Sequence, residues 1–450
     1  MLGWDRRANR YDLHPIVRGV TWSGLDNQDK QDIYETLSAH FESLPMIEGD
    51  RWQDVNSLED LTAAIELYNT LIGLGRYDDA EELFEDNFGK ALLYRLGAYR
   101  QITELLEMLF PDGLDQLPHL RTSRSQSFIL NALALSVSNQ PGRAAMLYRR
   151  SIDIDEKEGD QENASVGLCN LSSFLRFSGA LHESEGAARR ALLISRQLSE
   201  QGEESTSLLY LGLTLAAQGM NLDSAIALNR SLELALLSDE YISYDDQAMR
   251  TLWFGEYAQA RRLANQAMSF AQTNRFELGI IYAMRLQGEA ALGLGDLSTA
   301  EERLHHALAR ARTVNLVEQE LPALIGLAEL RRRQGDLKAA RELLDDVWEP
   351  CERGPFKLFH ADACNVLAQI ERDAGNHEAT VKAATEAYRL AWCDGPPFAY
   401  HWGLQKAKVH LAALGVPEPI LPPFDESKYE PMPEVEIEPL EEETEFEIEP

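Results

Sequence analysis

A glycine returns at an almost constant interval along most of this 450-residue chain, and each time a short turn and an alanine-containing apolar stretch follow it. From Gly179 onward the intervals are 40, 36, 40, 40 and 40 residues. Such a period indicates stacked supersecondary units rather than one globular core, so it limits the possible folds more than any other feature. The repeated glycines are Gly75, Gly179, Gly219, Gly255, Gly295, Gly335 and Gly375.

Each repeat is predicted to be a pair of amphipathic helices joined at its glycine. On both sides of Gly295 the apolar residues are three or four positions apart, which is the spacing of one helix face. Gly288 and Ala300 place small residues seven positions before and five after this glycine, where the paired helices would approach closely. Gly295 is expected to end the first helix in a left-handed conformation, and Asp296 to cap the second helix.

This pattern resembles the tetratricopeptide repeat, whose signature is a small residue, a glycine, an alanine, a large apolar residue and another alanine. The resemblance covers roughly residues 57–394 and implies an all-α fold, a right-handed α-solenoid of antiparallel helix pairs with a concave inner surface. Because the period exceeds the usual length of about 34 residues, the helices are predicted to be longer than in the minimal repeat. The unit that matches every position contains Gly288, Gly295, Ala300, Leu304 and Ala307.

The limits of the repeat divide the chain into five predicted segments. The last segment holds 8 of the 18 prolines and 13 acids against one lysine, so it is expected to be disordered. Aromatic residues near the end of the array are expected to seal its exposed apolar end. The segments are 1–25, a remnant of a winged-helix-like segment; 26–56, a linker helix and loop; 57–394, the solenoid; 395–415, a capping helix; and 416–450, a disordered tail rich in proline and glutamate.

Composition excludes several classes of function. A net charge of −32 repels nucleic-acid phosphates and anionic lipids, so neither nucleic acid nor membrane is an expected partner. Four cysteines without a CxxC pair form no disulfide framework, and a cytoplasmic location is predicted. His360 and Cys364 share a helix face but are too few for a zinc site, which takes four ligands. No catalytic motif is present, so we expect no enzyme activity, no catalytic residue, no metal and no cofactor.

The N-terminal segment Arg10–Trp22, RYDLHPIVRGVTW, carries a second resemblance. It is similar to the end of the winged-helix region of STAND signal-transduction NTPases of the NACHT and NB-ARC type, in which a tetratricopeptide array often follows as the sensor. The position that matches the family's ADP-contacting histidine is His14. The resemblance places the NTPase before Met1, and no GxxxxGK[ST] loop occurs within the chain. The chain is therefore expected to be either the C-terminal piece of a longer protein or a relative that lacks the NTPase domain. No nucleotide binding is expected.

The resemblance to tetratricopeptide arrays also indicates a binding surface. In that family the inner groove is lined by first-helix positions three before, one after and four after the small residue. Here these positions give an apolar middle and a polar C-terminal half with three arginines, which would suit an acidic peptide with apolar anchors. The predicted partner-binding residues are Arg176, Met249, Leu252, Arg285, Glu289, Leu292, Glu329, Arg332, Asn365, Gln369 and Arg372.

The function predicted from these features is a non-catalytic protein- or peptide-binding solenoid, the ligand-sensing arm of a STAND-type signalling or defence NTPase. Two alternatives stay open: a free-standing adaptor or scaffold protein, and a bacterial small-peptide receptor. Each repeat is expected to touch only its neighbours, which would give unfolding with low long-range cooperativity. A further hypothesis is that the acidic tail folds back into the groove and meets Arg285, Arg332 and Arg372.

Overall fold

The computed structural model describes residues 2–5, 10–13, 21–47, 49–238 and 244–437. The chain divides into two compact units. The first, the N-terminal unit, consists of residues Met1–Leu96 and Leu105–Arg121, and the second, the solenoid unit, consists of Gly97–Glu104 and Thr122–Pro450.

The N-terminal unit begins with an antiparallel pair of strands, in which Leu2 lies opposite Leu13. Its helical part has a small core, in which the fully buried Tyr68 donates a hydrogen bond from its hydroxyl group to the carbonyl oxygen of Leu105, at 2.9 Å. Two π turns interrupt the helical path after α4 and replace the regular repeat found later in the chain. The elements are β1 (Leu2–Asp5), β2 (Arg10–Leu13), α2 (Asn27–Glu42), η1 (Gly49–Asp54), η2 (Leu58–Leu61), α3 (Thr62–Gly73), α4 (Tyr77–Leu83), η3 (Phe84–Phe88) and η4 (Ala91–Arg95), with α5 (Tyr99–Glu107) shared between the two units.

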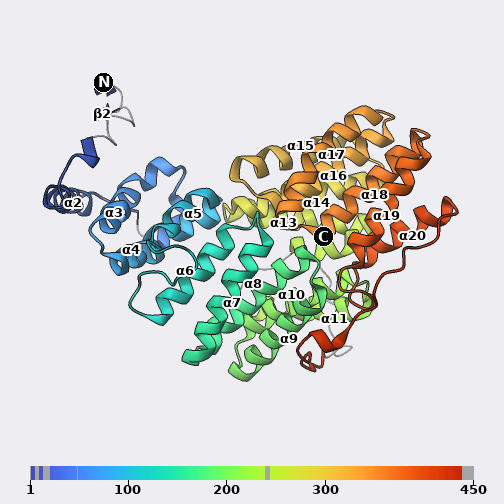
Figure 1. Cartoon of the computed structure of the whole chain (residues 1–450), viewed down its shortest axis with the longest axis horizontal. Helices are drawn as coiled ribbons and strands as arrows, with labels where there is room; N and C mark the ends of the chain where they lie inside the picture. The colour runs from blue at the N-terminus through green and yellow to red at the C-terminus, as the bar shows by residue number, and fades with distance from the viewer. Residues whose placement is uncertain (1, 6–9, 14–20, 48, 239–243, 438–450) are drawn as a thin grey trace. The chain divides into compact units, whose positions relative to one another are not determined.

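The solenoid unit is an all-α stack of antiparallel helix pairs, in which each helix packs on the next (Figure 1). The predicted α-solenoid is therefore confirmed. The first helices of the pairs have even numbers and the second helices odd numbers from α6 to α19. The helices are α6 (Ser123–Ser136), α7 (Pro141–Glu158), α8 (Gln161–Ser178), α9 (Leu181–Leu198), α10 (Gln201–Ala217), α11 (Asn221–Ser238), α12 (Tyr244–Trp253), α13 (Tyr257–Thr273), α14 (Glu277–Leu294), α15 (Leu297–Val314), α16 (Val317–Arg333), α17 (Leu337–Arg353), α18 (Lys357–Asp373), α19 (His377–Trp392) and α20 (His401–Ala413).

The repeated glycines adopt the left-handed conformation that the sequence predicts. All seven have φ between 71° and 85°, a region that residues with a Cβ atom rarely occupy. The carboxylate of Asp296 accepts a hydrogen bond from the backbone N–H of Thr299, and Asp336 does the same for Ala339. These contacts end one helix and start the next within two residues, which keeps each pair tightly antiparallel.

The small residues on either side of each glycine meet as expected. In the first regular pair, the hydroxyl groups of Ser172 and Ser184 each donate a hydrogen bond to the other residue's carbonyl oxygen, at 2.8 Å. A Cβ atom added to Gly288 would lie 2.6 Å from Cγ of Leu304, and Ala300 is fully buried. The helices of a pair therefore approach so closely that only small residues fit at these two positions.

The solenoid unit also closes on itself, because the late helix α18 packs against the early helix α8 along a line of long-range contacts that we call the seam. The backbone N–H of Gly142 donates to the carbonyl oxygen of Gly354 at 3.1 Å. The ring of Phe177 lies 6.1 Å from that of Phe356 and 5.6 Å from that of Phe359. The expectation that each repeat touches only its neighbours is therefore wrong, since the rotation from one pair to the next accumulates until the ends of the array meet.

The aromatic residues after α19 belong to this seam. The indole N–H of Trp402 donates to the carbonyl oxygen of Ala216 at 2.8 Å, and its ring lies 4.7 Å from that of Phe254. The fully buried Tyr400 donates its hydroxyl hydrogen to Asp362. Trp402 packs against the buried residues of α18 and α19 at the end of the array, and it also joins that end to α10 and Phe254.

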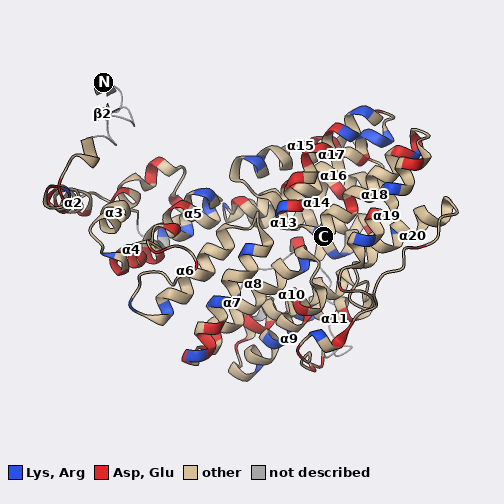
Figure 2. Ribbon diagram, in the orientation of Figure 1, with Lys and Arg blue, Asp and Glu red and all other residues tan. Residues whose placement is uncertain are grey.

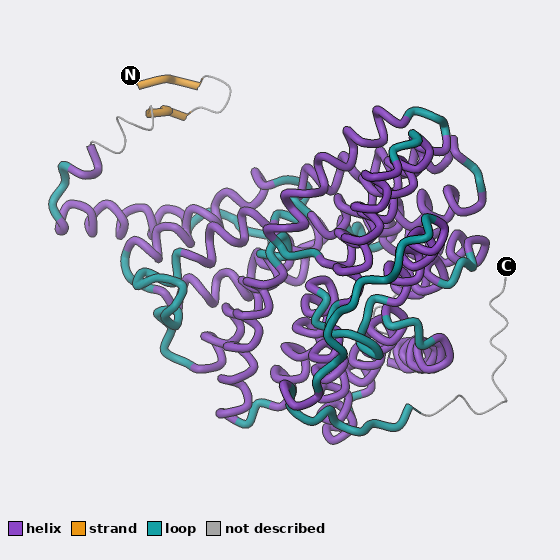
Figure 3. Tube along the Cα trace, turned by 45° about the vertical axis from the view of Figure 1, so that its right-hand side comes forward, coloured by secondary structure: helices purple, strands orange, loops and turns teal. Residues whose placement is uncertain are grey.

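The C-terminal segment differs from the expected disordered tail over residues 416–437, which follow the solenoid surface in an extended path (Figure 3). The indole N–H of Trp392 donates to the carbonyl oxygen of Pro422, and the ring of His182 lies 5.0 Å from Phe424 and 4.5 Å from Tyr429. Apolar side chains between the acids thus supply packing that the net charge alone does not suggest. Residues 438–450 lie outside the described part of the chain.

Charged residues of both signs are interleaved along the helices of the solenoid unit (Figure 2). Several form ion pairs between one second helix and the next, among them Arg190 with Glu156 and Arg312 with Asp346. These exposed pairs contribute little stability each, because water screens them. Within the part of the chain that the structure describes, no helix combines the length and the apolar character needed to span a lipid bilayer.

Candidate functional site

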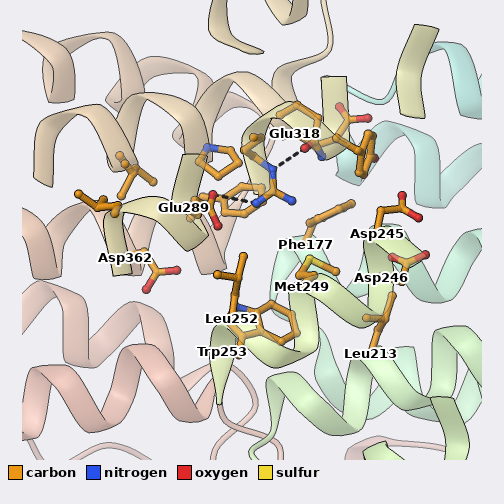
Figure 4. A pocket seen from close by; sticks show the side chains of 18 of the residues that line it. Phe177, Leu213, Asp245, Asp246, Met249, Leu252, Trp253, Glu289, Glu318 and Asp362 are labelled. Atoms are coloured by element: carbon orange, nitrogen blue, oxygen red, sulfur yellow. Dashed lines mark hydrogen bonds and ion pairs between the residues drawn. The ribbon is translucent and has the colours of Figure 1, made fainter. Parts of the chain in front are cut away.

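The first helices of the repeats surround a cavity of about 530 Å³ in the solenoid unit (Figure 4). Its wall comes from α8, α10, α12, α14, α16 and α18, and α20, which packs on α18 and α19, completes it. Half of the lining residues are aromatic or aliphatic, among them Phe177, Met249, Leu252 and Trp253. A volume within about 300–1,000 Å³ and an apolar wall with a few charged groups are typical of sites for small ligands.

Nine of the eleven residues predicted for the groove line this one cavity. Arg332 does not, because its guanidinium pairs with Glu329 and with Asp373 at the outer end of α16. Arg372 does not either, and its nearest ionic partner is Asp373, at 3.7 Å. The nine residues that the structure brings together are Arg176, Met249, Leu252, Arg285, Glu289, Leu292, Glu329, Asn365 and Gln369.

The sequence analysis did not identify the wall residues that lie one helical turn further toward the N-terminus on the same helix faces. Tyr282, Pro322 and Asp362 lie six positions before the small residue of their repeats, and all three line the cavity. Extending the predicted positions by one helical turn toward the N-terminus would have found them. Lys406 could not be found in this way, because it lies on α20, which follows the last repeat and packs on α18 and α19.

Three of the cationic side chains in the wall have carboxylate partners. Arg285 donates to Glu289 at 2.8 Å and to the side-chain oxygen of Gln319 at 2.6 Å, the two bonds drawn in Figure 4. Arg333 donates to Glu329 at 2.6 Å. The ammonium group of Lys406 lies 3.7 Å from Asp362. Their charges are therefore compensated within the wall.

Arg176 differs from these three. Its side chain is buried, with 3% of the residue exposed, and its Nε atom has no hydrogen-bond partner. No hydrogen bond or ion pair joins its side chain to any described residue, and its guanidinium lies 4.8 Å from the ring centre of Phe177. Burial lowers the pKa of Arg176, and the nearby Asp246 carboxylate opposes this shift. An arginine nevertheless stays charged in proteins, so the cavity holds a buried cation without a direct counter-ion.

Glu318 contributes a titratable group to the wall. Burial raises its pKa to about 7, and its Oε2 atom has no hydrogen-bond partner. Burial also raises the pKa of Asp362, while the Lys406 ammonium group and the Tyr400 hydroxyl group hold it down. Near neutral pH the charge of the cavity therefore changes with the protonation of Glu318.

The described residues contain no group of three or more His, Cys, Asp or Glu side chains that could hold a metal ion. Burial raises the pKa of Cys169 and of Cys364 to about 12, so both thiols stay protonated and are poor nucleophiles near neutral pH. Within the motif Arg10–Trp22, Arg10–Leu13 form β2, and His14 lies with residues 15–20 outside the described part of the chain.

Comparison with models of known protein families gives no match, and comparison with curated proteins gives none either. Among solved structures, the yeast Tom70 aligns with a TM-score of 0.39 and 12% identity, covering 86% of this chain and 93% of that one. A Rap protein complexed with Competence and Sporulation Factor aligns with a TM-score of 0.33 and 14% identity, covering 86% and 99%.

A STAND protein with a tetratricopeptide repeat sensor, from Pyrococcus horikoshii, aligns with a TM-score of 0.35 and 17% identity. The alignment covers 79% of this chain and 57% of the length of that protein. All three TM-scores lie below 0.5, so none of these proteins supplies an argument about the function of this chain.

Proposed function

We propose that the solenoid unit is a non-catalytic binding module that holds a short peptide, or a peptide segment of another protein, in its central cavity. The observation that carries the proposal is the seam, because closure of the array turns an open groove into a cavity of about 530 Å³. A space of this size suits a short peptide and is too small for a folded domain. Apolar side chains such as Met249 and Leu252 would receive the peptide's apolar residues.

The geometry favours a small-peptide receptor over a free-standing scaffold. A scaffold would use exposed surfaces, whereas the apolar residues expected for recognition face the cavity. The role as sensing arm of a STAND-type NTPase rests on the resemblance around His14 and is compatible with a peptide ligand. If it holds, a reading frame that continues upstream of Met1 should encode a GxxxxGK[ST] motif.

The test is to expose the full chain to a library of short peptides and to identify the retained peptides by mass spectrometry. Met249→Arg places a charge in the cavity wall and is expected to reduce retention at least tenfold. Met146→Arg is the matched control, because Met146 lies on α7 and is 60% exposed. Equal retention by both variants, or no retained peptide at all, would contradict the proposal.

A further inference from the structure

Among the described residues, one cation of the cavity wall, Arg176, has no carboxylate within ion-pair distance. Arg285, Arg333 and Lys406 each have a carboxylate within 4 Å, whereas Arg176 has no such partner among the described residues. All four side chains line the same space. The difference is therefore local to Arg176 and is not a general property of the cavity.

Leaving a guanidinium buried and unpaired is costly for the folded protein. Removal of a charged group from water costs several kcal/mol unless hydrogen bonds and an opposite charge replace the lost hydration. The contact with the Phe177 ring returns only about 0.5–2 kcal/mol of this cost. A charge that the fold retains at such a cost, and that lines a cavity, is ready to pair with an anion brought by a ligand.

We infer that the ligand of this cavity carries a carboxylate that pairs with Arg176. The inference rests on the proposed peptide-binding function and deepens it by naming the recognised group. A planar carboxylate can accept two parallel hydrogen bonds from a guanidinium, and this geometry gives strength and orientation together. In a peptide this group is either the C-terminal carboxylate or an aspartate or glutamate side chain.

The remainder of the wall selects a singly charged anion with an apolar body. Acids outnumber bases around the cavity, and Asp246 lies close enough to Arg176 to affect its pKa. A doubly charged phosphate would meet more repulsion from these carboxylates than a single carboxylate does. The apolar body would lie against Leu213, Met249 and Leu252.

The experiment measures binding of the retained peptides to the full chain by calorimetry, each as a free acid and as a C-terminal amide. A second pair of peptides exchanges an internal glutamate for glutamine. Loss of one carboxylate is expected to weaken binding to the wild-type chain by about 30-fold or more, because a buried charge then stays unpaired. The peptide pair that shows this loss identifies whether Arg176 binds the C-terminal carboxylate or the glutamate side chain.

Arg176→Met provides the second measurement. This variant should bind the acid and amide forms with equal affinity, and its melting temperature without ligand should rise, because an unpaired buried charge is removed. Arg100→Met is the control at an exposed arginine, 85% exposed at its side chain, and should keep the discrimination of the wild type.

The outcomes separate the two proposals. If no peptide binds the wild-type chain, the proposed function fails. If peptides bind but removal of either carboxylate changes nothing, the peptide-binding function stands and the role of Arg176 is wrong. The comparison of peptides on the wild-type chain needs no variant, so it decides the matter even if Arg176→Met does not fold.

Discussion

Two kinds of contact hold the solenoid unit together, and they are built from different residues. Contacts within and between neighbouring pairs use small side chains at fixed positions, such as the reciprocal hydrogen bonds of Ser172 and Ser184. The seam uses large aromatic residues without a repeat pattern, such as Phe177, Phe356 and Trp402. Local contacts thus make the array, and a small number of long-range contacts give it a closed interior.

The comparison also explains where the candidate site lies. An open array would expose its inner helices to water along their whole length. Arg176 of α8 and Asp362 of α18 line one cavity, so residues from distant parts of the chain share the same space. The cavity is therefore a product of the seam, whereas its wall residues are products of the repeat.

The largest effect is expected from breaking the seam at Trp402. Trp402→Ala removes the hydrogen bond to Ala216 and the ring contact with Phe254, at a cost of about 3 kcal/mol. Helices α8, α10, α18 and α20 should then exchange amide hydrogens faster, and peptide binding should weaken. Helix-by-helix hydrogen exchange measures this, with Val409→Ala, at a 65% exposed position of α20, as the control. Uniform exchange across all the helices would show that the seam is not a separate source of stability.

The second prediction concerns a contact within one repeat, the close approach of Gly288 on α14 to Leu304 on α15, which the substitution Gly288→Ala should disturb. Its new Cβ atom would lie 2.6 Å from Leu304, so overpacking should cost about 1–3 kcal/mol in urea unfolding, and Ala300→Leu at the partner position should cost as much. Gly186→Ala is the matched control: apart from the backbone of its own helix, no heavy atom lies within 4 Å of its Cβ position, and the substitution should stabilise by up to about 1 kcal/mol. Equal effects of the two glycine substitutions would refute the close approach described here.

A smaller and more local effect is expected from a chain that ends at Gly415. Loss of the ring contacts of Phe424 and Tyr429 with His182 should accelerate amide exchange in α9 and α19 by about tenfold. Exchange in α14 and α16 should not change, because the partners of Arg285 and Arg332 come from the helices themselves. Altered protection around Arg285 and Arg332 would instead favour a tail that reaches the cavity through residues 438–450.

The smallest effect concerns Glu318, which belongs to neither kind of contact. Because burial raises its pKa from 4.5 to about 7, the folded chain binds more protons than the unfolded chain between these values. Stability should therefore fall as the pH rises from about 5 to 8, by on the order of 1 kcal/mol. Urea unfolding of Glu318→Gln should lack this fall, while Glu342→Gln, at an exposed position of α17, should keep it. An identical pH profile for both variants would remove Glu318 as its source.

The repeat itself could be predicted because its signals are local. A glycine at φ near 80° ends a helix within its own turn, and small residues seven before and five after it act on the adjacent helix. The same periodicity located nine wall residues, since a helix face is determined by spacing alone. Arg332 and Arg372 occupy the same repeat position as wall residues such as Arg176 but do not line the cavity, and both have Asp373 as an ionic partner.

The amino-acid sequence by itself thus determined the helices, their pairing and the face that each turns inward, because these depend on interactions between residues close together in the chain. Only the tertiary structure decided that the array closes, that residues 416–437 pack on it, and that Arg176 is buried with no hydrogen-bond or ion-pair partner among the described residues. Closure depends on small rotations summed over many pairs, and no short segment encodes that sum. The unpaired state of Arg176 depends on every element around it, so it becomes visible only when all of them are in place.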